Sequence, residues 1–438
     1  MRHFSAPPIP TDSTPAVNVY TGGMAEAHRW LLTRDFSFMW WSQVLSQVAE
    51  GISKLALLWF VYAVTGSPLK TTVIGLLQTL PPILFGPFIG VIVDRFPKKT
   101  ILIASDVARG VLIGLIPCLV SVEHFTVGSL YLLTFLYGVA TAVFVPTLSS
   151  AVPFMVTRPQ FTAANALLQS TTSLGIIIGP AVSGLGIAFA GSQDVLCLNA
   201  MTYFASAACL LPIRLRVTEP TTVDGDGWRP FIRHLLEGIR YAFLTHRTVL
   251  MLIVLASVYT FGSGAFTTLF PVFGRHLLGL GPVEVGYLWS WLGVGLLLSS
   301  IGLIRMSGWD LSQRLSVITL SCALAGLALL GLTWTDDLRL AAVLVGGIGI
   351  GFGAWTPIAW GIIQEVAPAG MVGRVMAVYT ASATATSMLG MSAFGWVAES
   401  FGSVASLIGI GGVMVILAGG SAWFGKKIGV AVIGKADV

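Results

Sequence analysis

The sequence contains little charge and little cysteine. Only 10% of its 438 residues are Asp, Glu, Lys or Arg, whereas 55% are hydrophobic and the mean hydropathy is +0.86. Soluble domains carry about 25% charged residues, so a soluble globular protein is excluded. The apolar runs are about 20 residues long, the length of a helix that crosses the hydrocarbon core of a bilayer. We therefore expect an all-α integral membrane protein.

Other absences exclude classes of chemistry. Each of the four cysteines lies within an apolar run and none at paired loop positions, and no two histidines have His-x-x-x-His spacing, so we expect neither disulfides nor a metal site. The sequence has no Gly-x-x-x-x-Gly-Lys-Ser/Thr motif that could bind ATP phosphates. It also lacks a nucleophile, base and orienting residue at a recognisable spacing, so we expect no enzyme activity and no cofactor. Since the ATP-binding motif is absent, ATP-driven transport is also excluded.

The apolar runs divide into two groups of six. Residues 36–213 and 248–424 each contain six predicted membrane helices, and the longest hydrophilic stretch lies between them. This pattern predicts two pseudo-symmetric six-helix bundles, twelve transmembrane helices in all. The fifth, sixth and twelfth helices are expected at about 165–190, 195–213 and 404–424.

Three hydrophilic segments flank or separate these bundles. Residues 1–35 are polar and proline-rich, and we expect a disordered cytoplasmic tail rather than a signal peptide. Residues 214–247 are predicted to form a cytoplasmic loop that contains an amphipathic helix. Residues 425–438 are predicted to form a second cytoplasmic tail.

Basic residues follow the predicted topology. With the N-terminus inside, the lysines and arginines fall on the cytoplasmic side, apart from three outside and two within helices: Lys70, Arg275 and Arg339, then Lys54 and Arg109. This asymmetry places both termini in the cytoplasm and predicts a multi-pass protein of the cell inner membrane. It also accounts for the net charge of +5, so we expect no nucleic-acid partner. We expect a monomer in the lipid bilayer.

Four charged residues fall inside predicted helices, where a charge is costly and a functional role is the default hypothesis. Glu50 lies near the middle of the first helix, and Lys54 follows one turn later on the same face. Either Glu50 carries a proton and Lys54 modulates it, or the two form a permanent ion pair. Asp106 and Arg109 are three residues apart on the third helix and could form part of a gate or a purely structural pair.

The second predicted helix ends in the pattern Gly-x-x-x-Gly-x-x-x-Asp-Arg at residues 86–95, followed by two lysines. This pattern resembles the signature loop of the major facilitator superfamily. Gly86 and Gly90 predict close packing of another helix. The resemblance implies that Asp94 contacts the N-terminus of the eleventh helix, whose dipole favours a negative charge. The implied cytoplasmic gate comprises Gly90, Asp94, Arg95, Lys98 and Lys99, with Asp106 and Arg109 beside it; the alternative is a basic loop that only sets topology.

The fifth predicted helix carries a second pattern, formed by Gly175, Gly179, Pro180 and Gly184. It resembles the Gly-x-x-x-Gly-Pro-x-x-Gly-Gly string of antiporters in the superfamily, with Ser183 in place of one glycine. Thr134, however, occupies the position where many proton antiporters have an arginine, so that role cannot be transferred. Residues 38–43 and 57–67 resemble the macrolide-efflux and enterobactin-exporter-like branch of the superfamily.

Aromatic residues on helices of the second half are candidates for substrate binding. The helices that line the cavity in this superfamily carry Tyr259, Trp289, Trp291, Trp355, Trp360 and Tyr379. Aromatic walls suit an amphipathic or cationic small molecule, although Trp also concentrates at membrane interfaces.

Together these patterns predict a secondary active transporter that exports an amphipathic small molecule by proton antiport with alternating access. The alternatives are a proton-coupled uptake symporter and a non-transporting receptor or assembly scaffold on the same fold.

Overall fold

The structure is a computed structural model that describes residues 34–121, 126–156, 161–214, 240–241, 247–304, 309–367 and 372–436. The predicted N-terminal tail and most of the predicted amphipathic helix lie outside these residues. The first half contains α2 (Arg34–Thr65), α3 (Pro68–Arg95), α4 (Lys98–Ser121), α5 (Val127–Ala151), the single turn η1 (Val152–Phe154) and α6 (Phe161–Leu210). The second half contains α8 (Arg247–Leu277), α9 (Pro282–Ile304), α10 (Leu311–Gly331), the single turn η4 (Leu332–Trp334), α11 (Leu338–Val366), α12 (Val372–Phe401) and α13 (Ser403–Ala436). The expected all-α fold is confirmed.

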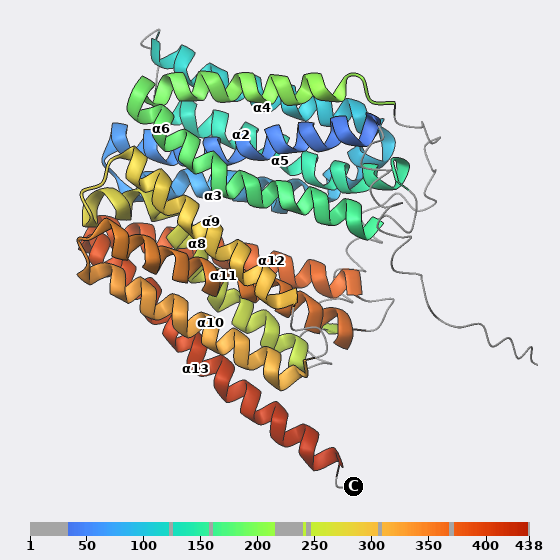
Figure 1. Cartoon of the computed structure of the whole chain (residues 1–438), viewed down its shortest axis with the longest axis vertical. Coiled ribbons are helices and arrows are strands. Elements are labelled where there is room, and N and C mark those ends of the chain that lie inside the picture. Colours follow the sequence, from blue (N-terminus) through green and yellow to red (C-terminus); the bar gives the residue numbers. More distant parts are fainter. Residues whose placement is uncertain are drawn as a thin grey trace, which may run out of the picture.

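Two helix boundaries differ from the prediction. The fifth and sixth predicted helices form α6, which is interrupted only at Gly191, where φ is 87°. Glycine reaches this conformation because it has no Cβ, and the chain folds back on itself there (Figure 1). The last helix, predicted to end at Phe424, continues to Ala436 because no proline stops it.

The membrane helices can be counted in two ways. Because α6 comprises two helices, the described residues form twelve long helical segments. Nine helices within the described ranges are long and apolar enough to cross a membrane, with α6 counted once. Helices α3 and α12 are not among these nine, and both supply polar side chains to the cavity described below. Twelve membrane crossings therefore stay a prediction.

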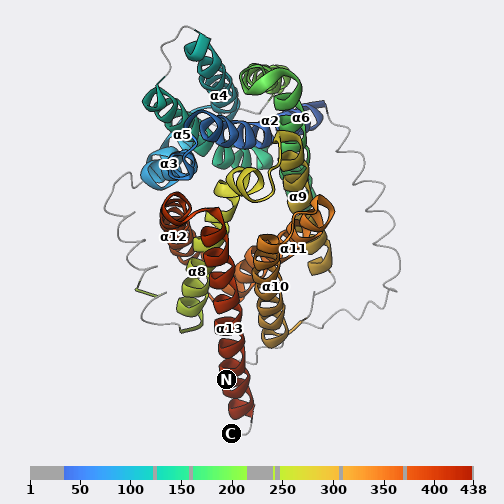
Figure 2. The same ribbon diagram turned by 90° about the vertical axis from the view of Figure 1, so that its left-hand side faces the viewer.

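Helices α2 to α6 lie together above helices α8 to α13 (Figures 1 and 2). The two groups meet along two seams, α6 against α9 and α3 against α12. In the first seam Gly184 faces Gly286, and a Cβ at Gly184 would lie 3.1 Å from the Cα atom of Gly286. The Ser290 hydroxyl also donates to the Ile177 carbonyl across this seam, at 2.6 Å. The small residues thus allow the two helix backbones to touch.

The second seam contains a carboxylate. Glu399 of α12 accepts hydrogen bonds from the Ser67 hydroxyl at 2.7 Å and from the Leu69 backbone N–H at 3.3 Å. Beside it, Tyr62 of α2 contacts His276 of α8, with ring centroids 5.4 Å apart. Both seams lie toward the end of the molecule where α2 and α8 finish and α9 begins, which we call the closed end (left in Figure 1).

The glycines of α11 pack helices together, as their place in the middle of an apolar run predicts. A Cβ at Gly349 or Gly353 would collide with α9, and one at Gly351 would lie 2.7 Å from the Cβ atom of Ala325 on α10. Glycines at every second position therefore alternate between the two neighbouring helices.

Candidate functional site

Two adjoining cavities of about 260 and 210 Å³ lie between the halves and share Thr79 of α3. The larger is lined mainly by α8, α11 and α12, and the smaller mainly by α2, α3 and α5. Because Thr79 belongs to both, we treat them as one central cavity with a C-half wall and an N-half wall.

Aromatic rings form part of the C-half wall. Trp355, Trp360 and Tyr379 line the cavity, and the Trp355 indole N–H donates to the Tyr379 hydroxyl at 3.1 Å. Tyr259 lies behind them, stacked on Trp355 with centroids 5.0 Å apart, and its hydroxyl donates to the Phe352 carbonyl. Three of the six aromatic residues proposed from the sequence thus face the cavity directly. Trp289 and Trp291 do not belong to either lining.

Hydroxyl groups complete the C-half wall, and the sequence analysis missed them. Five come from the second half: Thr260, Thr356, Thr380, Thr384 and Ser387. A signal was present, because residues 379–387 place Thr or Ser at five of nine positions inside an otherwise apolar helix. Together with the rings, these hydroxyls make a wall that offers both apolar surface and hydrogen bonds.

The N-half wall contains the charges. Glu50 and Lys54 both line the cavity, together with Tyr137, Gln78 and Thr141. No ion pair joins Glu50 to Lys54 among the described residues, so the alternative of a permanent pair does not hold in this conformation. The Lys54 ammonium instead lies 5.8 Å from the ring centroid of Trp289 on α9, across the seam.

Two further polar groups of the N-half wall lack a hydrogen-bond partner within the described part of the chain. They are the Nε2 atom of Gln78 and the hydroxyl of Thr141, both shielded from solvent. A buried polar group without a partner costs about 1 to 3 kcal/mol. The wall can therefore satisfy these groups by binding a ligand oxygen.

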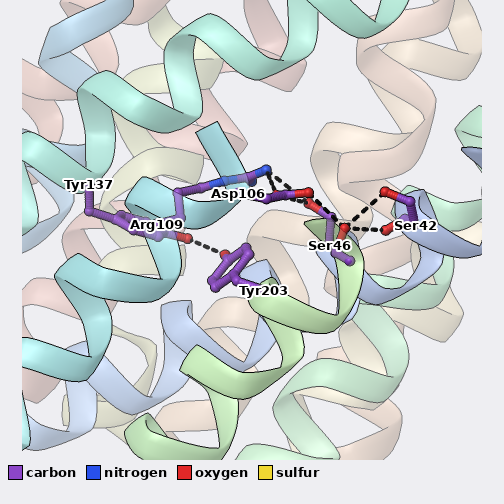
Figure 3. A network of polar contacts seen from close by, with 7 residues as sticks. Ser42, Ser46, Asp106, Arg109, Tyr137 and Tyr203 are labelled. Carbon is purple, nitrogen blue, oxygen red and sulfur yellow. Dashed lines mark hydrogen bonds and ion pairs between the residues drawn. The ribbon is translucent and has the colours of Figure 1, made fainter. Parts of the chain in front are cut away.

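A buried polar network lies behind the N-half wall (Figure 3). Asp106 and Arg109, both fully buried, form an ion pair within α4. Asp106 also accepts hydrogen bonds from the Ser206 hydroxyl at 2.7 Å and the Ser46 hydroxyl at 3.4 Å. Ser42 of α2 bonds to Ser206 at 2.9 Å. All these partners belong to the first half, which agrees with the structural alternative for this pair, and its role in a gate stays a prediction.

Arg109 also contacts aromatic rings. Its Cζ atom lies 4.1 Å from the ring centroid of Phe144 and 4.8 Å from that of Tyr203, so both rings face the cation. The hydroxyls of Tyr203 and Tyr137 lie 2.7 Å apart, and Tyr137 reaches the cavity. The Nε atom of Arg109 has no partner in the described chain. The network thus extends from the interior of the first half to the cavity wall.

One sequence signal could have revealed this network. On α2, Ser42, Ser46, Glu50 and Lys54 recur every four residues, and we call them the polar stripe. Each step of four advances about 40° beyond a full turn of the helix. The stripe therefore winds from the bundle interior, where the serines meet Asp106, to the cavity, where Glu50 and Lys54 lie.

The predicted gate loop is only partly described. The side chains of Gly90 and Asp94 lie outside the described residues. Arg95 is exposed at the end of α3, Lys98 donates to the Val93 carbonyl, and Lys99 donates to the Leu211 carbonyl at 2.6 Å. The role of these residues in a gate stays a prediction.

One expectation about this loop is wrong in this conformation. A Cβ at Gly86 would meet no atom within 4 Å, so the close helix packing expected there is not formed. In the second half, two charged residues at the start of α10 contact residues of the same half. Asp310 caps α10, and Arg314 pairs with Glu365 at 2.6 Å.

The glycine pattern of α6 contacts two helices. A Cβ at Gly175 would collide with Gln47 of α2, and one at Gly179 would lie 2.6 Å from the Cα atom of Gly51, beside Glu50. Pro180 and Gly184 face α9 on the other half. The pattern thus packs the helix that carries Glu50 on one side and forms a seam on the other. Its role in antiport stays a prediction.

The comparison with protein families decides what kind of protein carries this site. The sequence model of the Major Facilitator Superfamily matches residues 39–391. The chain belongs to this superfamily. It is a multi-pass membrane transporter, and its family is not one of enzymes.

Similar curated proteins of the superfamily are efflux pumps. The chain is 23% identical over 354 residues to macrolide efflux protein A of Streptococcus pyogenes, covering 80% of this chain and 86% of the relative. It is 26% identical over 383 residues to the multidrug efflux pump Tap of Mycolicibacterium fortuitum, covering 84% and 90%. The resemblance to macrolide-efflux proteins found in the sequence is therefore confirmed, at low identity.

Solved transporters share the fold. The crystal structure of nucleoside transporter NupG matches with a TM-score of 0.69 at 13% identity, covering 90% of this chain and 97% of that one. An inward-facing, unoccupied bacterial homologue of the lysosomal transporter Spinster matches with a TM-score of 0.68 at 13% identity, covering 89% and 96%. At such identities the likeness concerns the major facilitator fold alone.

Proposed function

We propose that this transporter exports an amphipathic small molecule in exchange for protons. One observation carries the proposal: Glu50 and Lys54 face the same central cavity as an aromatic and hydroxyl-bearing wall, and they are not paired with each other. An ionisable residue that faces a cavity at membrane depth is a candidate for carrying a transported ion. Glu50 binds the proton, and Lys54 modulates it.

The cavity chemistry supports an amphipathic cargo. The rings of Trp355, Trp360 and Tyr379 offer apolar faces, and the threonine hydroxyls beside them offer hydrogen bonds. On the opposite wall, Gln78 and Thr141 offer polar groups next to Glu50. Since the relatives are named for macrolide and multidrug efflux, the macrolide erythromycin and the cationic dye ethidium are the first compounds to test.

The seams support alternating access. The distribution of basic residues predicts that the protein lies in the cell inner membrane with both termini in the cytoplasm. In this orientation the closed end faces outward. The structure then corresponds to an inward-facing state. Rocking of the halves would separate the seams and bring the loop around Asp94 and Arg95 to the opposite half.

The test uses purified protein in liposomes with a pH gradient. If the proposal holds, erythromycin or ethidium dissipates the gradient with the native protein and not with Glu50→Gln. Glu365→Gln, an exposed carboxylate away from the cavity, is the matched control and should behave as the native protein. Substrate accumulation that follows protons inward would instead indicate an uptake symporter. Binding of these compounds without any movement of protons or substrate would indicate a receptor or scaffold.

A further inference from the structure

A continuous line of polar groups joins the cavity to the buried ion pair of α4. Tyr137 lines the cavity with Glu50, and its hydroxyl lies 2.7 Å from that of Tyr203. The ring of Tyr203 faces the guanidinium of Arg109, with Cζ 4.8 Å from the ring centroid. Both tyrosines are buried, with 4% and 0% of their surface exposed. Figure 3 shows the dashed contact between the Tyr137 and Tyr203 hydroxyls, with Arg109 close to both residues.

Glu50 shares the N-half wall with Lys54 of α2 and Tyr137 of α5. Through Tyr203 of α6, Tyr137 connects this wall to Arg109 of α4. Helices α3, α8 and α12 add only Gln78, Gly75, threonines and Met391 to the same cavity, and none of these side chains titrates. Outside the polar stripe, the line of tyrosines is thus the connection between Glu50 and a buried cation.

The two hydroxyls can adopt either hydrogen-bond direction, because each oxygen can donate or accept. When Glu50 is charged, Tyr137 can donate to its carboxylate and accept from Tyr203. When Glu50 is protonated, the order can reverse. Arg109 favours the first arrangement because its positive charge faces the Tyr203 ring and polarises the hydroxyl of Tyr203 toward donating its proton.

We propose that Tyr137 and Tyr203 are positioning residues that stabilise the charged form of Glu50 and link it to the buried pair of Arg109 and Asp106. The proposal rests on the proposed proton-coupled function, because it assigns the control of that proton site. A tyrosine pair with only a packing role would support the fold and leave the protonation of Glu50 unchanged.

The test measures protonation of Glu50 directly and needs no transported compound. Dicyclohexylcarbodiimide modifies protonated carboxyl groups in apolar surroundings, and mass spectrometry gives the modified fraction of the peptide that contains Glu50 at each pH. The full-length protein is compared with Tyr137→Phe and Tyr203→Phe, and Glu50→Gln defines the background. Tyr131→Phe is the matched control, because Tyr131 is also on α5 but donates to the Lys70 carbonyl, away from the cavity.

The pH at half-maximal modification should rise by roughly one unit in Tyr137→Phe and in Tyr203→Phe, since a lost donor disfavours the charged carboxylate and Glu50 keeps its proton to higher pH. Tyr131→Phe should match the native protein. The proposal is overturned if the pH at half-maximal modification is unchanged in both variants, or if the extent of modification falls while this pH stays the same. It is also overturned if Glu50 of the native protein is not modified at any pH at which the protein is folded.

This result is separable from the fate of the proposed function. If Glu50→Gln abolishes proton exchange in liposomes but the tyrosine variants keep the native midpoint, only the role of the tyrosines is overturned. If Glu50→Gln exchanges protons as the native protein does, the proton-carrier assignment itself is overturned.

Discussion

In the buried ion pair of α4, the carboxylate has more of its hydrogen-bonding groups paired than the guanidinium has. Asp106 accepts from Arg109, Ser46 and Ser206, whereas the Nε atom of Arg109 has no partner in the described chain. A buried charge is tolerated when it is paired and hydrogen-bonded, and it is costly when its counter-ion is removed. The fold of the first half should therefore depend strongly on the carboxylate.

Asp106→Asn tests this dependence. Asparagine keeps the size of the side chain but leaves the Arg109 charge buried without a counter-ion, which should cost about 3 to 5 kcal/mol of stability. Thermal unfolding of the purified protein in detergent measures the loss. The control is Glu365→Gln, which breaks the Arg314–Glu365 pair, whose carboxylate side chain is 61% exposed. An exposed pair contributes about 0 to 1 kcal/mol, so equal losses in the two variants would contradict the argument.

The aromatic side of the cavity can be tested at Trp360. This indole lines the cavity and is 42% exposed, so its removal should leave the fold intact. If it stacks on cargo, Trp360→Ala should weaken ethidium binding by about 1 to 2 kcal/mol, roughly tenfold in the dissociation constant. Fluorescence titration of the purified protein gives the constant. Trp396→Ala removes an indole that is also exposed, on α12 away from the cavity, and should bind as the native protein does.

At the scale of the helix, the sequence predicted most elements but not how they are divided or joined. The apolar runs identified each helix, but a loop was expected between the two helices that form α6. The chain instead turns at the single residue Gly191, because its positive φ reverses the chain without further loop residues. Of the polar stripe of α2, the sequence analysis predicted a role only for Glu50 and Lys54, because an uncharged serine inside an apolar helix is not unusual. Its contact with Asp106 depends on the packing of α2, α4 and α6, which spacing along one helix does not determine.

The seam between α6 and α9 gives a test at the same scale. A Cβ at Gly286 would lie 3.1 Å from the Cα atom of Gly184, and it would also collide with the Pro180 carbonyl. Gly286→Ala should therefore push the halves apart at the closed end, at a cost of about 1 to 3 kcal/mol to this conformation. Distances between spin labels placed on α6 and α9 would lengthen or become bimodal.

A matched substitution lies on the same helix. A Cβ at Gly302 of α9 would meet no atom within 4 Å, so Gly302→Ala should leave the label distances unchanged. If Gly286→Ala behaves like Gly302→Ala, the backbone contact between the halves does not limit the conformation.

For the whole molecule, the sequence predicted the superfamily from the glycine and charge patterns of residues 86–95 and 175–184, and the efflux branch from residues 38–43 and 57–67. It did not predict the conformation. Which ends of the helices touch depends on contacts between residues more than 300 positions apart, such as Ser67 with Glu399. Glu399 belongs to no motif, and Ser67 is only the last residue of the stretch 57–67, so the sequence gives no sign that the two residues meet.

Glu399 is therefore the residue at which the closed state of the whole molecule can be tested. Its carboxylate holds the Ser67 hydroxyl and the Leu69 N–H, and hydrogen bonds to a charged group contribute about 1.5 to 3 kcal/mol. In Glu399→Ala we expect faster hydrogen–deuterium exchange across residues 66–71 and a larger population of molecules open at this end. Asp194→Ala removes an exposed carboxylate of α6 near Gly191 and should leave this exchange unchanged. A transporter must open both ends in turn, and hydrogen bonds of this strength are weak enough to break when the halves rock. Unchanged hydrogen–deuterium exchange in Glu399→Ala would mean that the glycine seam between α6 and α9 keeps the closed end shut without Glu399.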